Sequence, residues 1–172
     1  MLITIRNYCH PDTGWFRYLQ LAADNWNVAC RGAGKDIQLQ VLDSGYADCT
    51  QILYAQGEIT VCERPRPADK PGELAQGNTG LLQPSWGYGW VEMFVPSTGM
   101  SESFATAIPA HELGHALGNR NHAPYPSVMG PTPVAIMPTA DDVAAIWTPP
   151  APQPAPAPAP PKKKKKKKKG KH

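Results

Sequence analysis

The sequence predicts a mixed α+β domain with a C-terminal extension that does not join its core. Short runs of alternating apolar and polar residues predict strands, and two longer stretches carry apolar residues at helical spacing. The third observation is an end rich in proline, alanine and lysine. Because strands and helices do not alternate regularly, we expect a mixed sheet rather than a βαβ repeat. A chain of 172 residues is long enough for one domain with a real core.

The first predicted elements are a strand and a helix. Residues 2–8 alternate in polarity and predict the strand, and residues 15–29 predict the helix, with Asp12 or Thr13 as its N-cap. The apolar face of this helix is expected to consist of Trp15, Tyr18, Leu19, Ala22 and Trp26.

The middle of the chain predicts further strands. Residues 36–43, 50–55 and 58–63 are short runs with strand character. Residues 64–89 are rich in proline, glycine and polar residues, so we expect a loop there. The run "WVEMFV", residues 90–95, predicts one more strand.

Two helices are expected before the extension begins. One covers residues 104–117 and the other lies within "TADDVAAIW", residues 139–147. In the second helix Thr139 is the expected N-cap, and Asp142 three residues later completes a capping box. We interpret Asp141 and Asp142 as first-turn helix charges rather than as a catalytic pair.

The C-terminal extension divides into two parts after a folded domain of residues 1–148. Residues 149–161 are rich in proline and alanine, which excludes a helix or an inner strand and predicts an extended linker. Residues 162–172 form a poly-lysine tail that we expect to be disordered. The tail holds nine lysines, so the preceding domain carries 8 Lys and Arg against 14 Asp and Glu and is acidic.

This charge division bears on the partners of the chain. An acidic domain is not expected to bind nucleic acid by itself. The lysine tail can bind a polyanion, such as nucleic acid, an anionic surface or an acidic wall polymer, or it can serve only to keep the chain in solution.

Cysteine usage and targeting signals leave the compartment open. Four cysteines occur outside any CxxC pair, so a cysteine-based zinc site is not expected, and either two disulfides in one of three pairings or four buried thiols fit the sequence. The cysteines are Cys9, Cys30, Cys49 and Cys62. We find no signal-peptide pattern at the N-terminus and no apolar run of transmembrane length, and therefore expect a soluble protein.

The stretch "HELGHALGNRNHA", residues 111–123, carries the clearest chemistry. On a helix, His111 and His115 project from the same face one turn apart, where two imidazoles can hold one Zn²⁺. Glu112 then lies beside the metal, where it can act as a general base. Gly118 is expected to end the helix in a left-handed turn that brings back a third ligand, and Gly114 is expected to allow the close approach of another group.

This stretch resembles the metzincin signature HExxHxxGxxH followed by a Met-turn, and "HELGHALG" is similar to the matrixin and snapalysin-like branches. The resemblance extends over residues 1–148 and implies a zincin domain. Such a domain has a twisted, mostly parallel sheet, an antiparallel edge strand and two to three helices. It also implies that a substrate pairs with the edge strand, which we expect at Trp90, Val91, Glu92, Met93, Phe94 and Val95.

The chain departs from the family pattern at the third ligand. Asn121 occupies the place where the family has its histidine, and His122 follows one residue later. We expect His122 to be the ligand, with a loop one residue longer, because an amide is a poor zinc ligand. The alternative is that Asn121 or water fills the place and the site is weak or inactive. Met129 fits the Met-turn spacing better than Met137, although either can be an ordinary core methionine.

The sequence therefore predicts a zinc metalloendopeptidase of metzincin type. Its single catalytic Zn²⁺ would be held by His111, His115 and His122, and Glu112 would be the general base toward a zinc-bound water. A structural Ca²⁺ is compatible with the family, but nothing in the sequence supports one. The alternative function is a polyanion- or nucleic-acid-associated module with a degenerate zinc site. The resemblance also implies a monomeric, extracellular protein that acts on proteins or peptides, with residues 130–138 shaping its specificity.

Overall fold

The computed structural model describes residues 1–82, 85–124, 126–132 and 134–147, and they form an α+β fold. The strands are β1 (Leu2–Asn7), β2 (Gln38–Asp43), β3 (Glu58–Glu63), β4 (Ala75–Leu82) and β5 (Ser85–Met93). The helices are α1 (Trp15–Gly32), α2 (Glu102–Ala116) and α3 (Ala140–Ala145), with short 3₁₀ turns at η1 (Pro11–Thr13) and η2 (Cys49–Gln51). The predicted linker 149–161 and lysine tail 162–172 lie outside the described residues.

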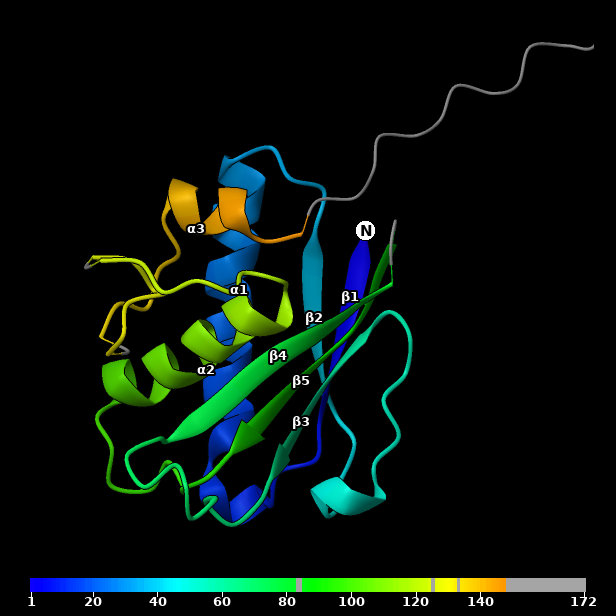
Figure 1. Cartoon of the computed structure of the whole chain (residues 1–172), viewed down its shortest axis with the longest axis vertical. Helices are drawn as coiled ribbons and strands as arrows, with labels where there is room; N and C mark the ends of the chain where they lie inside the picture. The colour runs from blue at the N-terminus through cyan, green and yellow to red at the C-terminus, as the bar shows by residue number, and fades with distance from the viewer. Residues whose placement is uncertain (83–84, 125, 133, 148–172) are drawn as a thin grey trace, which may run out of the picture.

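The strands form one five-stranded sheet in the order β2-β1-β3-β5-β4 (Figure 1). β1 pairs in parallel with β2 and with β3, and β3 pairs in parallel with β5. β4 runs antiparallel to β5 and ends the sheet on that side. The expectation of a mostly parallel sheet with an antiparallel edge strand is therefore confirmed at this level.

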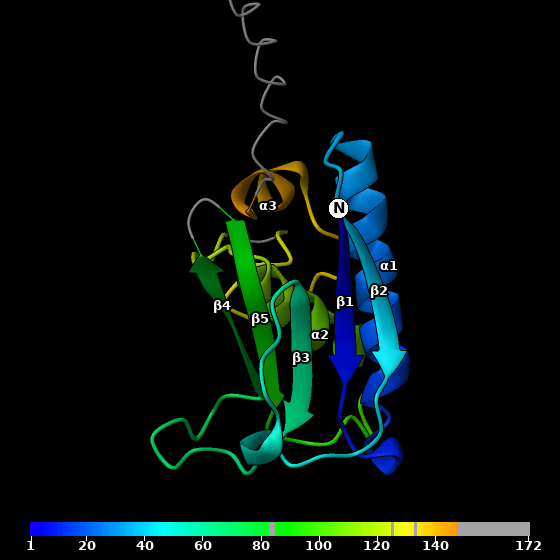
Figure 2. The ribbon, with the colours of Figure 1, turned by 90° about the vertical axis from the view of Figure 1, so that its right-hand side faces the viewer.

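The two long helices cover one face of this sheet (Figure 2). α1 packs against β2 and α2 packs against β4 and β5, and the two helices also contact each other. Between helices and sheet lies a core that includes fully buried side chains from every layer, among them Ile3, Ile5, Trp15, Trp26, Ile59 and Leu113. Burial of side chains of this size is the main source of stability in a domain like this one.

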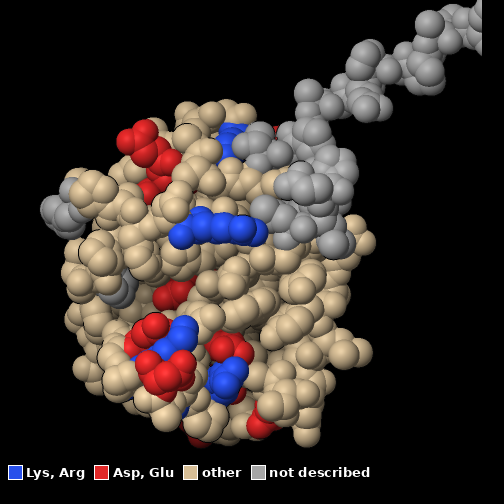
Figure 3. Space-filling view, in the orientation of Figure 1, with Lys and Arg blue, Asp and Glu red and all other residues tan. Residues whose placement is uncertain are grey.

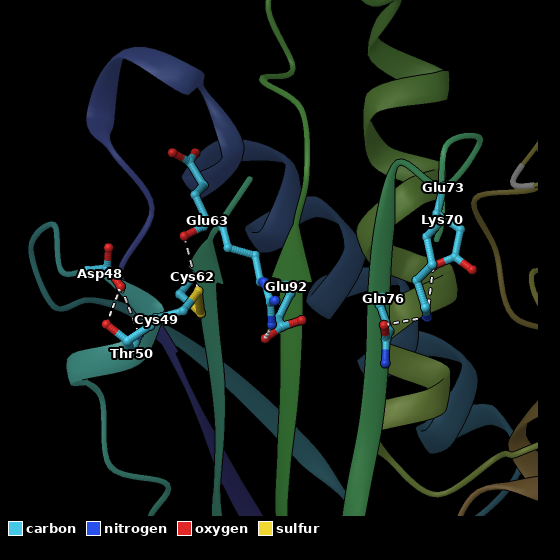
Figure 4. Close-up of polar contacts among 10 residues, drawn as sticks. Asp48, Cys49, Thr50, Cys62, Glu63, Lys70, Glu73, Gln76 and Glu92 are labelled. Atoms are coloured by element: carbon cyan, nitrogen blue, oxygen red, sulfur yellow. Dashed lines mark hydrogen bonds and ion pairs between the residues drawn. A yellow bond between two sulfur atoms is a disulfide. The ribbon is translucent and has the colours of Figure 1, made fainter. Parts of the chain in front are cut away.

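The opposite face of the sheet is partly covered by the segment that joins β2 to β3 (Figure 2). A disulfide between Cys49 and Cys62 ties this segment to β3, with 5.5 Å between the two Cα atoms (Figure 4). Cys9 and Cys30 are buried free thiols. The structure therefore matches neither possibility drawn from the sequence, two disulfides or four buried thiols, but contains one disulfide and two buried thiols.

The N-terminal predictions are largely confirmed. The first strand lies where it was predicted, and the first helix begins at Trp15 but extends three residues beyond the predicted end, to Gly32. The predicted cap is wrong, because the N-cap is Gly14 in a left-handed conformation and no side chain caps the helix. The hydroxyl of Thr13 instead lies within hydrogen-bond distance of two acceptors, the backbone carbonyl of His10 and the carboxylate of Glu63.

Two predictions in the middle of the chain are wrong. Residues 50–55 form no strand: they contain the end of η2 and an irregular stretch in which Leu53 is 91% exposed. Within this stretch the ring of Tyr54 stacks on Tyr88, with 5.5 Å between the ring centroids. Residues 64–89 are not a continuous loop, because they include β4 and the first part of β5.

The predicted position of the edge strand is also wrong. Residues 90–93 belong to β5, which is paired on one side with β3 and on the other with β4. Phe94 and Val95 follow the end of that strand. The alternation of "WVEMFV" indicates a strand but does not reveal whether a neighbour covers each edge. The edge strands of the described sheet are β2 and β4, and β4 is the antiparallel one.

Candidate metal centre

The candidate metal centre is built on α2, which begins two residues before the predicted start. Ser101 caps the helix by accepting a hydrogen bond from the backbone N–H of Phe104. Nearly all residues between Ala105 and Ala116 are buried, as expected of a helix packed on more than one side. α2 therefore presents His111 and His115 inside the molecule, where their rings are oriented by their surroundings rather than by solvent.

Backbone carbonyl groups fix the orientation of both rings. The Nδ1 atom of His111 lies 2.9 Å from the carbonyl oxygen of Val128, and that of His115 lies 2.7 Å from the carbonyl oxygen of Asn119. A carbonyl can only accept, so each Nδ1 donates its proton and each Nε2 keeps a lone pair. A carbonyl that holds the far ring nitrogen in this way is typical of histidines that bind a metal.

The two Nε2 atoms face each other at 3.1 Å. Two lone pairs at this distance repel each other, and a shared cation relieves that repulsion. Protonation is the less favourable remedy, since burial lowers the pKa of His111 to about 4 and also lowers the pKa of His115. A tetrahedral zinc ion bonded to both nitrogens would separate them by about 3.3 Å, so the pair fits such an ion.

A tight turn after α2 brings a third histidine to this pair. Gly118 has φ +108°, and the backbone N–H groups of Gly118 and Asn119 donate to the carbonyls of His115 and Gly114. This is the Schellman pattern that reverses a chain at the end of a helix. The prediction that Gly118 ends the helix in a left-handed conformation is confirmed.

His122 completes a three-histidine group that could hold a metal ion. One ligand atom from each of His111, His115 and His122 lies within 4.8 Å of the others. The ring centroid of His122 is 5.1 Å from that of His111 and 5.2 Å from that of His115. The backbone N–H of Asn121 donates a hydrogen bond to the side chain of Asn119. His122, one residue further along than the family pattern has its histidine, is the residue that reaches the other two rings.

Met129 packs against α2 at Gly114, on the helix that carries His111 and His115. It is fully buried, and a Cβ at Gly114 would overlap its sulfur atom. Gly114 thus provides the close approach that the sequence suggested. Met137, the other candidate, is 43% exposed.

Asp142 is a residue of this centre that the sequence did not reveal. Its buried carboxylate accepts hydrogen bonds from the Ser127 hydroxyl, the Val128 backbone N–H, and the backbone and hydroxyl groups of Thr139. The predicted capping box with Thr139 is confirmed. Asp142 also binds the backbone N–H of Val128, the residue whose carbonyl orients His111. The capping pattern was the visible signal, but this second contact arises only from the fold.

Glu112 lies buried beside the histidines, against the edge strand. Burial raises the pKa of its carboxyl to about 7, opposed by a backbone hydrogen bond from Gly77 and by the charge of Lys70. Packing is close here, since a Cβ at Gly77 would overlap the backbone carbonyl of Glu112. Glu112 is therefore held at a fixed place between α2 and β4.

All four residues, His111, Glu112, His115 and His122, line one groove of about 840 Å³. Residues 70–78 supply one wall, of which residues 75–78 belong to β4. α2 forms the floor, and residues 119–132 contribute Asn119, Arg120, His122, Pro131 and Thr132. In the space-filling view, charged side chains gather around a hollow on this face (Figure 3).

Comparisons with known proteins do not place the chain in a family. No protein-family model and no curated protein matches it. Among solved structures it is similar to a chain from "Structure of a chaperone-substrate complex", with 13% identity and a TM-score of 0.45. The similarity covers 83% of this chain but about a third, 34%, of that one. At this level it identifies neither a family nor a function.

Fold and site together define an α+β protein with a three-histidine group able to hold a metal ion. Among the described residues, no helix combines the length and apolar character needed to cross a membrane.

Proposed function

We propose that this protein is a zinc-dependent endopeptidase. The observation that carries the proposal is the convergence of His111, His115 and His122 with the buried carboxyl of Glu112 in one groove beside an edge strand. Neutral imidazoles suit Zn²⁺. A catalytic zinc usually has three protein ligands, whereas a structural zinc has four.

When bound, the zinc ion supplies a Lewis acid and lowers the pKa of water enough to provide a nucleophile near neutral pH. The chain's own residues prepare this chemistry. The carbonyls of Val128 and Asn119 hold the rings of His111 and His115 so that each Nε2 faces the site. The buried Met129 packs against the same helix at Gly114, in keeping with the role of a Met-turn methionine.

Glu112 is the group that moves the proton. Its carboxylate accepts a proton from the attacking water and then delivers that proton to the leaving amine. A pKa raised by burial suits both steps, because the same carboxyl must gain and release a proton near neutral pH. The contact with Gly77 keeps the carboxyl from rotating out of the groove.

β4 takes the role of the substrate-binding strand that was first expected at residues 90–95. As an edge strand it has backbone groups directed away from the sheet, and its residues 75–78 line the groove. An extended peptide paired with this edge would pass over Glu112 and the histidines. The strand would position the peptide through main-chain hydrogen bonds, which are independent of the peptide's sequence.

Substitution of Glu112 by glutamine tests this proposal. The change keeps the shape of the side chain and removes its ability to accept a proton. We expect the zinc-loaded Glu112→Gln chain to retain about one zinc per chain and to lose peptide cleavage by several orders of magnitude. Metal content by atomic absorption and digestion of unfolded casein would measure the two properties.

Two results would contradict the proposal. One is a Glu112→Gln chain that cuts casein as fast as the parent chain. The other is a parent chain that cuts no peptide with zinc bound. Glu102→Gln serves as the matched control, since Glu102 lies on the same helix, is exposed and does not line the groove.

A further inference from the structure

Four charged side chains line the described part of the groove: Lys70, Glu73, Glu112 and Arg120. Their distribution is uneven. Lys70 and Glu73 lie on the wall that leads into β4, Glu112 lies on the floor, and Arg120 lies on the loop that follows α2. The partners of the two cations determine which of them is free to meet an anionic ligand.

Lys70 is already neutralised. Its ammonium group lies 3.1 Å from the carboxylate of Glu73 and 2.7 Å from the amide oxygen of Gln76 (Figure 4). A ligand carboxylate would have to displace Glu73 to reach it. This wall of the groove therefore offers little net attraction for an anion.

Arg120 differs from Lys70 in its exposure and, within the described part of the chain, in its lack of a partner. It is exposed, and among the described residues its guanidinium has neither an ion pair nor a hydrogen bond. Its backbone is nevertheless fixed on both sides. Asn119 accepts from the His115 ring and from the Asn121 backbone N–H, and Gly118 sets the turn before it. A free guanidinium thus projects from a rigid base beside the histidines.

We propose that Arg120 selects peptides that carry an acidic side chain near the cleaved bond, an inference that rests on the proposed peptidase function. An extended peptide directs alternate side chains to opposite sides. Those directed toward the loop after α2 come within reach of Arg120. The planar guanidinium binds a carboxylate through two parallel hydrogen bonds, a geometry that a neutral amide cannot reproduce.

The test compares matched peptides on the full zinc-loaded chain. Each pair of C-terminally amidated peptides differs only by Glu or Gln at one position, and the pairs scan four positions on each side of the cut. We expect at least one Glu peptide to be cut about fivefold faster than its Gln partner, the effect of one exposed ion pair. In Arg120→Gln this ratio falls to one, and Arg120→Lys retains part of the preference. Arg31→Gln, at the exposed end of α1, is the control and keeps the full ratio.

A binding measurement separates this inference from the proposed function. Fluorescence anisotropy of labelled Glu and Gln peptides on the Glu112→Gln chain reports the preference without cleavage. If the parent chain cuts no peptide, the peptidase proposal fails, and the anisotropy still decides the role of Arg120. Equal affinity for Glu and Gln peptides, or a preference that persists in Arg120→Gln, overturns the inference. So does a preference that is absent with the amidated peptides and appears only when the same peptides carry a free C-terminal carboxylate, because Arg120 would then recognise a chain end.

Discussion

At the scale of single residues, Asp142 connects the end of the described chain to the candidate metal centre. Its carboxylate oxygens accept hydrogen bonds from the Ser127 hydroxyl, from the Val128 backbone N–H, and from the backbone N–H and hydroxyl of Thr139. The carboxylate therefore holds the backbone of Val128, whose carbonyl orients the His111 ring. An amide in its place would have to direct its NH₂ group at one of these donors.

We accordingly predict that Asp142→Asn weakens zinc binding about 10- to 100-fold, as is usual when a group that holds a metal ligand in place is lost. The free energy of unfolding should fall by about 2 kcal/mol, because hydrogen bonds to a charged group are lost. Competition with a zinc-sensitive dye and urea unfolding would measure these effects. Asp141→Asn, at the exposed neighbouring position, should change neither. Equal behaviour of the two variants would remove Asp142 from the site.

Some residues of the candidate site could be located from the sequence, and others could not. His111, Glu112 and His115 could be located because helical geometry fixes the relative directions of nearby residues. His122 required a decision against Asn121, and the structure places its ring with the other two. Asp142 could not be located, since its contacts with Ser127 and Val128 depend on how two distant segments pack.

At the scale of elements, the contact between β4 and α2 determines the width of the groove. Gly77 lies against the backbone of Glu112, with no room for a side chain between them. A strand that carried a larger residue here would stand further from the helix. The absence of a side chain at Gly77 therefore allows the proposed base and the proposed substrate-binding edge to lie close together.

Gly77→Ala should lower the free energy of unfolding by about 1–3 kcal/mol, because the added methyl group overlaps the helix backbone. Urea unfolding of the full chain would measure this loss. The matched control is Gly72→Ala, which also lines the groove but meets no atom within 4 Å. A Gly77→Ala chain as stable as the Gly72→Ala chain would show that β4 moves freely relative to α2.

The same glycines explain why the sequence did not reveal β4. The strand reads "AQGNTGLL", and glycine and asparagine are depleted in strands. Gly77 makes room for α2, and Gly80 makes room for the ring of Tyr88. A local sequence pattern reports the secondary-structure propensity of a segment. The two glycines are instead required by side chains and backbone that pack against them in the fold. The interior position of residues 90–93 was missed for the same reason, since the partner strand was not visible.

At the scale of the whole molecule, the candidate metal centre joins parts of the chain that are distant in sequence. α2 carries two histidines, the loop after it carries the third, and the buried turn at Val128 and Met129 supports them. Metal binding to such a site should stabilise the entire fold, because the unfolded chain does not hold the three rings together.

We predict that zinc at about 100 times its dissociation constant stabilises the chain by about 2.7 kcal/mol, which raises Tm by roughly 5–10 °C for a domain of this size. Thermal unfolding of the full chain with zinc and with a chelator would measure the shift. His111→Ala should abolish it. His10→Ala, at an exposed turn away from the groove, should preserve it. A similar shift in His111→Ala would indicate that zinc binds elsewhere.

The overall architecture was predictable to the level of its class. Strongly periodic elements such as β1, β3 and α1 appear close to their predicted positions. The irregular stretch around Leu53 was mistaken for a strand, because exposure cannot be read from the type of a single residue.

The unusual composition of β4 has a consequence for the molecule in concentrated solution. An open strand edge able to accept a peptide can equally accept the same edge of another copy, and that route leads to aggregation. Glycine and asparagine weaken such unspecific association, since they contribute little to a growing sheet. The glycine- and asparagine-rich composition that concealed β4 in the sequence thus also disfavours self-association of the protein. Selection of a bound peptide would then depend on the histidine-lined groove rather than on the strand edge.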